Sequence, residues 1–227
     1  ASQAGHQVIL YDLSQSTLDE SASKLAKIMS RLVEKKRITI EESHEIQGRI
    51  VRSTQIDLFE GCDLVVEAVV ENLDVKHSVF KQIENIVSSD CIVASNTSSL
   101  SITSLAAGCN HPERVVGLHF FNPAPLMPLV EIVPAIQTSE DTPLHLVSLM
   151  KNWGKSPVIA KDSPGFIVNR VARPFYGEAL RILDEGIADV PTIDTAMRNL
   201  GFKMGPFQLM DLIGHDVNYA VTESVFK

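Results

Sequence analysis

The chain has little of what marks several large classes of protein. Its 227 residues include only three cysteines, and none of these has the CxxC spacing of a zinc or redox site. No apolar run is long enough to cross a bilayer, and no signal-peptide pattern opens the sequence. We therefore expect a cytoplasmic protein without a metal site, in which Cys62 and Cys91, with their apolar neighbours, are reduced and buried.

Basic charge is also scarce. Twenty Lys and Arg residues face 28 Asp and Glu residues, so the formal net charge is −8. This balance argues against a nucleic-acid-binding surface, although a local basic patch could still hold a phosphorylated ligand. The chain is 44% hydrophobic and 21% charged, which is typical of a globular protein with a substantial core.

A glycine-rich G-x-G-x-x-G turn occurs nowhere in the sequence. Gln7–Asp12 is nevertheless an apolar run that ends in an acid, as in the strand whose acid binds the adenosine ribose of a dinucleotide. In such folds the glycine turn lies about twenty residues before the acid. Either the first strand and its turn are missing from this chain, or Asp12 is an ordinary turn or helix-cap residue.

Strand and helix signals alternate along the first part of the chain. We expect strands at Gln7–Asp12, Asp63–Ala68, Cys91–Ser95, Val115–Phe120, Leu129–Val133 and Pro157–Ala160. Helical spacing of apolar residues predicts helices around Leu18–Leu32, Val75–Val87 and Leu144–Trp153, the first capped by Ser14 or Ser16. This alternation predicts an α/β sheet covered by helices on both faces.

The pattern changes near Asp162–Gly165, after which nothing resembles a strand. We expect helices at Phe166–Leu183, Thr192–Asn199 and Pro206–Leu212, and we expect Pro174 to kink the first of these or to end it early. The predicted domains are therefore residues 1–162 and an all-α region at residues 163–227.

One carboxylate stands in an unusual place. Glu131 lies within the apolar stretch Leu129–Val133, where an unpaired charge would be costly to bury. Prolines between the two segments turn the chain, so His119 and Glu131 can meet side by side as a general base and its partner. The alternatives are a solvated edge glutamate and an ordinary core histidine.

Four segments together resemble the L-3-hydroxyacyl-CoA dehydrogenase family, and most closely its bacterial 3-hydroxybutyryl-CoA and 3-hydroxyadipyl-CoA members. The segments are Ser95–Leu100, His119–Val133, Asp162–Arg170 and Met204–Gly214. The resemblance implies a Rossmann-like NAD-binding domain that lacks its first strand and glycine turn, followed by an incomplete helical domain. The chain alone would then bind NAD poorly and be nearly inactive.

The resemblance also implies a reaction and its residues. Members oxidise the 3-hydroxyl of an acyl-CoA with NAD, or run the reverse reduction. His119 would remove the hydroxyl proton, Glu131 would orient the imidazole, and Ser98 and Asn169 would hydrogen-bond the substrate's C3 oxygen. Ser98 could also be the N-cap of a helix at Leu100–Ala106.

Asn169 could instead be an exposed helical residue. Its neighbours Ile167, Val168 and Val171 predict a largely buried segment, in which an amide would need partners.

The cofactor side follows from the same resemblance. It assigns Asp12 to the adenosine ribose, Glu71 and Lys76 to the nicotinamide ribose, and Ser98 and Asn122 to the nicotinamide end. An acid at Asp12 would repel a 2′-phosphate and so favour NAD over NADP.

The resemblance also implies a partner, and the sequence leaves alternative functions open. The family commonly dimerises through its helical domain, so a homodimer is expected. The basic cluster of Lys35, Lys36 and Arg37 is either a solvated helix end or a contact for the phosphates of CoA. A non-catalytic, crystallin-like protein on the same scaffold and a different nicotinamide-dependent hydroxy-acid dehydrogenase are the alternative functions.

Overall fold

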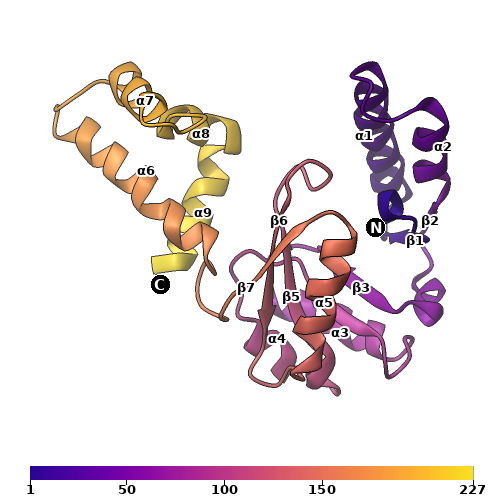
Figure 1. The fold of residues 1–227 in the computed structure, drawn as a ribbon. Coiled ribbons are helices and arrows are strands. Elements are labelled where there is room, and N and C mark those ends of the chain that lie inside the picture. Colours follow the sequence, from indigo (N-terminus) through magenta and orange to yellow (C-terminus); the bar gives the residue numbers. More distant parts are fainter. Residues whose placement is uncertain (227) are drawn as a thin grey trace.

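The computed structural model describes residues 1–226, so Lys227 lies outside the described part of the chain. It has a sheet region and a helical region, which are joined by the segment around residue 163 (Figure 1). The Rossmann-like α/β architecture and the all-α region expected from the sequence are both present.

The sheet region is built on five strands in the order β3-β4-β5-β6-β7. Their bounds are Leu64–Glu67, Ile92–Ser95, Val115–Phe120, Leu129–Pro134 and Ser156–Ile159. Strands β3, β4 and β5 are parallel to one another, β6 is antiparallel to β5, and β7 is parallel to β6. All five strands lie where the apolar runs predict them.

Helices cover both faces of this sheet because alternate residues of each strand point to opposite sides. Helices α3 (Leu73–Glu84) and α4 (Ile102–Ala107) pack on one face, and α5 (Asp141–Asn152) packs on the other. One core includes Val65, Phe80, Ile83, Val93, Ile102, Leu105, Val115 and Val133. The other includes Ala94, Val116, Leu118, Val130, Ile132, Leu146 and Met150.

Two further strands form a separate sheet. Strand β1 (Val8–Tyr11) pairs in parallel with β2 (Ile50–Ser53), and helices α1 (Gln15–Glu34) and α2 (Ile40–Gly48) connect them. Within residues 1–226, neither strand pairs with the five-stranded sheet, so β1 and β3 each have one edge without a strand partner.

The short helical turns and the caps near the start of the chain complete this part. Gly5, at φ 93°, ends the 3₁₀ turn Ser2–Ala4. Ser14, one of the two serines expected to cap α1, is its N-cap. Two other 3₁₀ turns, Ile56–Gly61 and Pro112–Arg114, precede β3 and β5. Strand β2 and helix α2 are not among the elements expected from the sequence.

The helical region consists of α6 (Val168–Asp184), α7 (Val190–Asn199), α8 (Pro206–Ile213) and α9 (His215–Phe226). Its core is formed by Tyr176, Ala179, Ile193, Phe207 and Met210. None of the helices among residues 1–226 is long and apolar enough to cross a membrane.

Of the two outcomes expected for Pro174, a kink or an early end of the helix, the early end is wrong, because α6 runs through the proline to Asp184. A proline inside a helix removes one backbone hydrogen bond. Tyr176 and Ala179, which follow the proline, are buried in the helical core, and their packing offsets that loss.

Candidate active site

His119 and Glu131 face each other across two neighbouring strands. The antiparallel register of β5 and β6 places the two residues directly opposite each other. Nδ1 of His119 lies 2.8 Å from Oε2 of Glu131, and the exposed fractions of the two residues are 6% and 0%. The contact that the sequence predicts between them is therefore present.

The second oxygen of Glu131 binds the start of the helical region. Oε1 accepts the backbone N–H groups of Ile167 and Val168, each at 2.9 Å. Helix α6 has no side-chain cap from its own N-cap residue, Ile167. A carboxylate from the sheet region thus satisfies amides that would otherwise lack partners at this helix start, where negative charge is favoured.

These contacts determine the charge of Glu131. Burial alone would raise the pKa of the Glu131 carboxyl group, but the hydrogen bonds from His119, Val168 and Ile167 outweigh it and lower the pKa. Glu131 is therefore a carboxylate at neutral pH and can only accept hydrogen bonds. It follows that Nδ1 of His119 carries a proton, so that in the neutral imidazole Nε2 is the nitrogen that can act as a base, an assignment made from the hydrogen-bond network.

Two aromatic rings flank the imidazole of His119. The ring centroids of Phe121 and Phe166 lie 4.5 Å and 5.8 Å from that of His119. Phe121 follows β5 and Phe166 precedes α6, so both regions of the chain contribute to the walls of the site.

Asn169 and Ser98 are also brought together. Nδ2 of Asn169 donates to the backbone oxygen of Ser98 at 3.4 Å. The prediction of a buried segment around Asn169 is wrong, however, because Ile167 is 44% exposed and Val171 is 71% exposed. The bonds from Glu131, and not apolar packing around these two residues, hold the first turn of α6 against the sheet region.

Ser98 is not the helix cap that the sequence offers as its alternative role. Helix α4 begins at Ile102, and its N-cap is Ser101. The carboxylate of Asp162 accepts the backbone N–H groups of Ile102 and Thr103 at the same helix start. Ser98 lies before this cap, in the loop that follows β4.

Glu71 and Lys76 lie beside that loop. Oε1 of Glu71 accepts the backbone N–H of Ser98 at 3.2 Å and the hydroxyl of Ser99 at 2.9 Å. Nζ of Lys76 lies 3.4 Å from Oε2 of Glu71. Three of the residues predicted for the cofactor, Glu71, Lys76 and Ser98, therefore form one cluster at the carboxyl ends of β3 and β4.

Sequence reasoning missed one member of this cluster. Glu67, the last residue of β3, lies 2.7 Å from Nζ of Lys76, and both side chains are only 1% exposed. The signal was present, because Glu67 ends the apolar run Leu64–Glu67 just as Glu131 lies within another.

The contacts of Glu71 also shift its ionisation. Burial would raise the pKa of this carboxyl group, but the hydrogen bond from Thr97 and the nearby Lys76 ammonium outweigh burial and lower the pKa. Glu71 is thus a hydrogen-bond acceptor at neutral pH, and 38% of its side chain remains exposed.

Asp12 and Asn122 lie apart from these contacts. Asp12 directly follows β1, in the two-stranded sheet, and its Oδ1 accepts the backbone N–H of Ser14 at 2.8 Å. That bond is the turn role offered as its alternative, and it occupies one of the two carboxylate oxygens. Asn122 is exposed after β5 and precedes Pro123 across a cis peptide bond.

The candidate cofactor residues fit part of a dinucleotide. Asp12, Glu71 and Ser98 all follow the carboxyl ends of parallel strands, which is where α/β sheets bind ligands. The carboxylates of Asp12 and Glu71 suit ribose hydroxyls. A glycine-rich turn for the phosphates is not found among residues 1–226, and no group of three or more metal-binding side chains occurs there.

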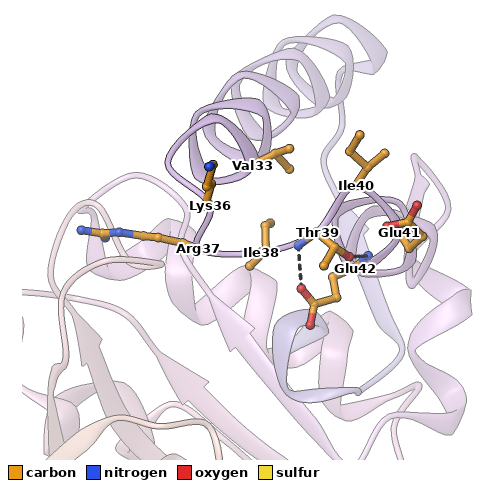
Figure 2. A pocket seen from close by; sticks show the side chains of 8 residues that line it. All are labelled: Val33, Lys36, Arg37, Ile38, Thr39, Ile40, Glu41 and Glu42. Carbon is orange, nitrogen blue, oxygen red and sulfur yellow. Dashed lines mark hydrogen bonds between the residues drawn. The ribbon is translucent and has the colours of Figure 1, made fainter.

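The basic cluster borders a surface pocket of about 410 Å³ between α1 and α2 (Figure 2). Lys36 and Arg37 line it, and Lys35 does not. The opposite wall is acidic, with Glu42 bonded to Thr39 in a capping box. In Figure 2 the Arg37 side chain points away from these two residues.

The three cysteines are free thiols. Cys91 is fully buried as predicted, whereas Cys62 is only half-buried. Burial raises the pKa of Cys91 to about 11 and that of Cys109 to about 12, so both stay protonated at neutral pH.

The chain is similar in sequence to known protein families along its whole length. Residues 1–163 match the model for the NAD-binding domain of 3-hydroxyacyl-CoA dehydrogenase, and residues 165–227 match the model for the C-terminal domain of 3-hydroxyacyl-CoA dehydrogenase. Two curated relatives have high identity. The 3-hydroxyadipyl-CoA dehydrogenase of Escherichia coli is 45% identical over all of this chain and 48% of its own length. A probable 3-hydroxybutyryl-CoA dehydrogenase of Deinococcus radiodurans is 40% identical over 98% of this chain and 80% of its own length.

Solved structures give the same likeness. A crystal structure of 3-hydroxybutyryl-CoA dehydrogenase from Escherichia coli matches with a TM-score of 0.95 at 45% identity, over all of this chain and 48% of that chain. This chain thus spans about half the length of the E. coli relative.

Proposed function

This chain belongs to the 3-hydroxyacyl-CoA dehydrogenase family, and from that premise we propose that it serves the reversible oxidation of a 3-hydroxyacyl-CoA to the 3-oxoacyl-CoA with NAD. One observation carries the proposal. A buried carboxylate, Glu131, accepts a hydrogen bond from the Nδ1–H of His119 and leaves Nε2 to act as the base, at a site to which both regions of the chain contribute.

His119 is the proposed general base. Nε2 accepts the proton of the 3-hydroxyl group, and the imidazole becomes a cation. Glu131 stabilises this cation at 2.8 Å without taking the proton, because its own pKa is lowered. The chemistry that bound NAD would supply is that of a hydride acceptor for C3. In the reverse direction His119 returns the proton to the new hydroxyl group.

Ser98 and Asn169 are proposed to hydrogen-bond the C3 oxygen of the substrate. Two observations support this role: the two residues are in contact, and Ser98 is not the cap of α4. Asn169 follows directly after the two residues bound by Glu131, so one carboxylate supports both the base and the segment that carries Asn169.

The proposed cofactor contacts are divided between the two sheets. Glu71 and Lys76 serve the nicotinamide ribose, Ser98 and Asn122 serve the nicotinamide end, and Asp12 serves the adenosine ribose. Their positions after parallel strands support this assignment, and the acid at Asp12 favours NAD over NADP.

The proposed assembly is a homodimer formed through the helical region. Exposed apolar side chains in that region support it, and they include Val171, Ile187, Leu200, Leu212 and Tyr219. Light scattering of the purified protein would test the dimer. The free thiols fit the reducing cytoplasm that we expect as the compartment, and cell fractionation would test it.

The decisive experiment follows NADH absorbance as the full-length protein meets acetoacetyl-CoA. We expect acetoacetyl-CoA to be reduced and free acetoacetate to be ignored. Reduction of free acetoacetate at an equal rate would indicate another kind of hydroxy-acid dehydrogenase. Binding of NADH without reduction of either compound would contradict the proposed activity.

A further inference from the structure

Glu67 is a buried carboxylate for which the proposed chemistry has no use. It ends β3, and its side chain is 1% exposed. Both of its oxygens are bonded. Oε1 accepts from Nζ of Lys76 at 2.7 Å and from the backbone N–H of Val69 at 2.6 Å, and Oε2 accepts from the hydroxyl of Ser95 at 2.8 Å. So complete a set of partners fixes the position of this carboxylate.

One branch from Glu67 runs through Lys76. The ammonium group of Lys76 lies between two carboxylates, Glu67 at 2.7 Å and Glu71 at 3.4 Å. It also donates to the backbone oxygen of Val69 at 3.3 Å. A buried cation needs a close counter-ion, and the shorter contact makes Glu67 the main one. Glu71 is therefore free to direct its other oxygen to the loop that carries Ser98.

A second branch runs through Ser95. The hydroxyl of Ser95 donates to Glu67 and accepts the backbone N–H of Thr97 at 3.2 Å. Thr97 in turn donates its hydroxyl to Glu71. The two branches that leave Glu67 thus meet again in residues 97–99.

We propose that Glu67 is a positioning residue that acts through Lys76 and Ser95 to hold the loop of residues 97–99, and Ser98 with it, in the conformation that receives the nicotinamide end of the cofactor. The inference rests on the proposed function for its ligand. The two carboxylates would then have different roles. Buried Glu67 pairs with the ammonium group of Lys76, whereas half-exposed Glu71 binds the loop and accepts a hydrogen bond from a hydroxyl group of the ligand.

Removing the charge of Glu67 should change which carboxylate pairs with Lys76. In Glu67→Gln, Lys76 has Glu71 as its only carboxylate partner within this cluster and should draw it away from the N–H of Ser98. Hydrogen exchange of the cofactor-free full-length protein measures this loss directly. We expect the Thr97 and Ser98 amides to exchange about tenfold faster, the scale of one lost hydrogen bond to a charged group, while the amides of β5 keep their rates.

Binding provides a second measurement. The dissociation constant for NADH, from a fluorescence titration, should rise about tenfold in Glu67→Gln. The Michaelis constant for acetoacetyl-CoA should change much less. Glu60→Gln, which removes an exposed carboxylate from the turn before β3, is the matched control and should leave both quantities unchanged.

A double substitution tests whether Glu67 acts through Lys76. If it does, Glu67→Gln combined with Lys76→Met should speed exchange of the Ser98 amide less than Glu67→Gln alone, because no ammonium group is left to draw Glu71 away. Exchange of the Ser98 amide that is as fast in the double variant as in Glu67→Gln would overturn this route. If Glu67→Gln does not fold, Ser95→Ala decides: it should speed exchange of the Thr97 amide while the amides of β5 keep their rates.

Two results would overturn the inference as a whole. One is that the amides of Thr97 and Ser98 exchange at wild-type rates in Glu67→Gln and that this variant binds NADH with wild-type affinity. The other is faster exchange spread evenly over β5 and the helical region, which would indicate a purely structural role. A wild-type protein that fails to reduce acetoacetyl-CoA would instead contradict the proposed function, and it would leave the exchange result intact.

Discussion

The sheet region contains two buried carboxylates, Glu131 and Glu67, which differ in the kind of partner they have. Glu131 faces the imidazole of His119, a ring with one nitrogen that can donate and one that can accept a proton. Glu67 faces the ammonium group of Lys76, which has donors only. The same device, an acid in an apolar strand, therefore supports proton transfer in the proposed mechanism at one place and fixed geometry in our proposal at the other.

The largest effect is expected when His119, the proposed base, is replaced. His119→Gln should lower kcat by about 10³-fold, because the general base is lost, and should leave NADH affinity nearly unchanged. Steady-state kinetics and a fluorescence titration of the full-length protein measure the two quantities. His145→Gln, an exposed histidine on α5, is the control. Near-normal turnover of His119→Gln would remove His119 from the mechanism.

Removing the charge of Glu131 should have the next largest effect. Glu131→Gln keeps the shape of the side chain but loses the charge that stabilises the imidazolium, so kcat should fall by about 10²-fold. The same change weakens the bonds to Ile167 and Val168 and should lower the free energy of unfolding by about 2 kcal/mol. Urea denaturation checks the second effect. An unchanged stability would contradict the double role of this carboxylate.

The lowered pKa values of the Glu131 and Glu71 carboxyl groups predict how the stability of the protein depends on pH. A carboxyl group whose pKa is lower in the folded state stabilises the fold above its unfolded pKa of about 4.3, and this contribution is lost as the pH falls toward the folded value. The stability difference between wild type and Glu131→Gln should therefore shrink below about pH 4.3. Glu71→Gln should show the same trend more weakly, because its side chain is 38% exposed. Differences that grow on acidification would contradict both shifts.

The smallest effect is expected where charges are exposed. If the basic cluster contacts the phosphates of CoA, Lys36→Glu with Arg37→Glu should raise the Michaelis constant for acetoacetyl-CoA about fivefold and leave that for a truncated thioester unchanged. Lys24→Glu, on the exposed surface of α1, is the control. Equal increases in the Michaelis constants of the two thioesters would instead indicate that the cluster is a solvated helix end.

Much of the fold could be predicted from the sequence because burial leaves a clear pattern. The strands of the five-stranded sheet are short apolar runs, and their bounds fall within a few residues of those expected. Strand β2 was missed because Ile50–Ser53 has only two apolar residues and is defined by its long-range pairing with β1. Propensity within four residues does not carry that information.

The site was predictable wherever two residues had to meet, and less so where a third element intervened. The His119–Glu131 contact follows from one turn between two strands. The exposure of Ile167 and Val171 could not be predicted in this way. Their helix is held by hydrogen bonds from Glu131 and not by burial of its first turn. Glu67 ends an apolar strand much as Glu131 lies within one, so the cost of burying an unpaired carboxylate predicts a partner for both residues.

The cap that Glu131 places on α6 also bears on the order of folding. Ile167 supplies no cap of its own, so the first turn of α6 lacks its acceptor until β5 and β6 have paired. Interactions that form after the folding barrier mainly slow unfolding and have little influence on the folding rate. The cap on α6 would then form only after His119 and Glu131 have met, and its bonds would act chiefly to delay unfolding.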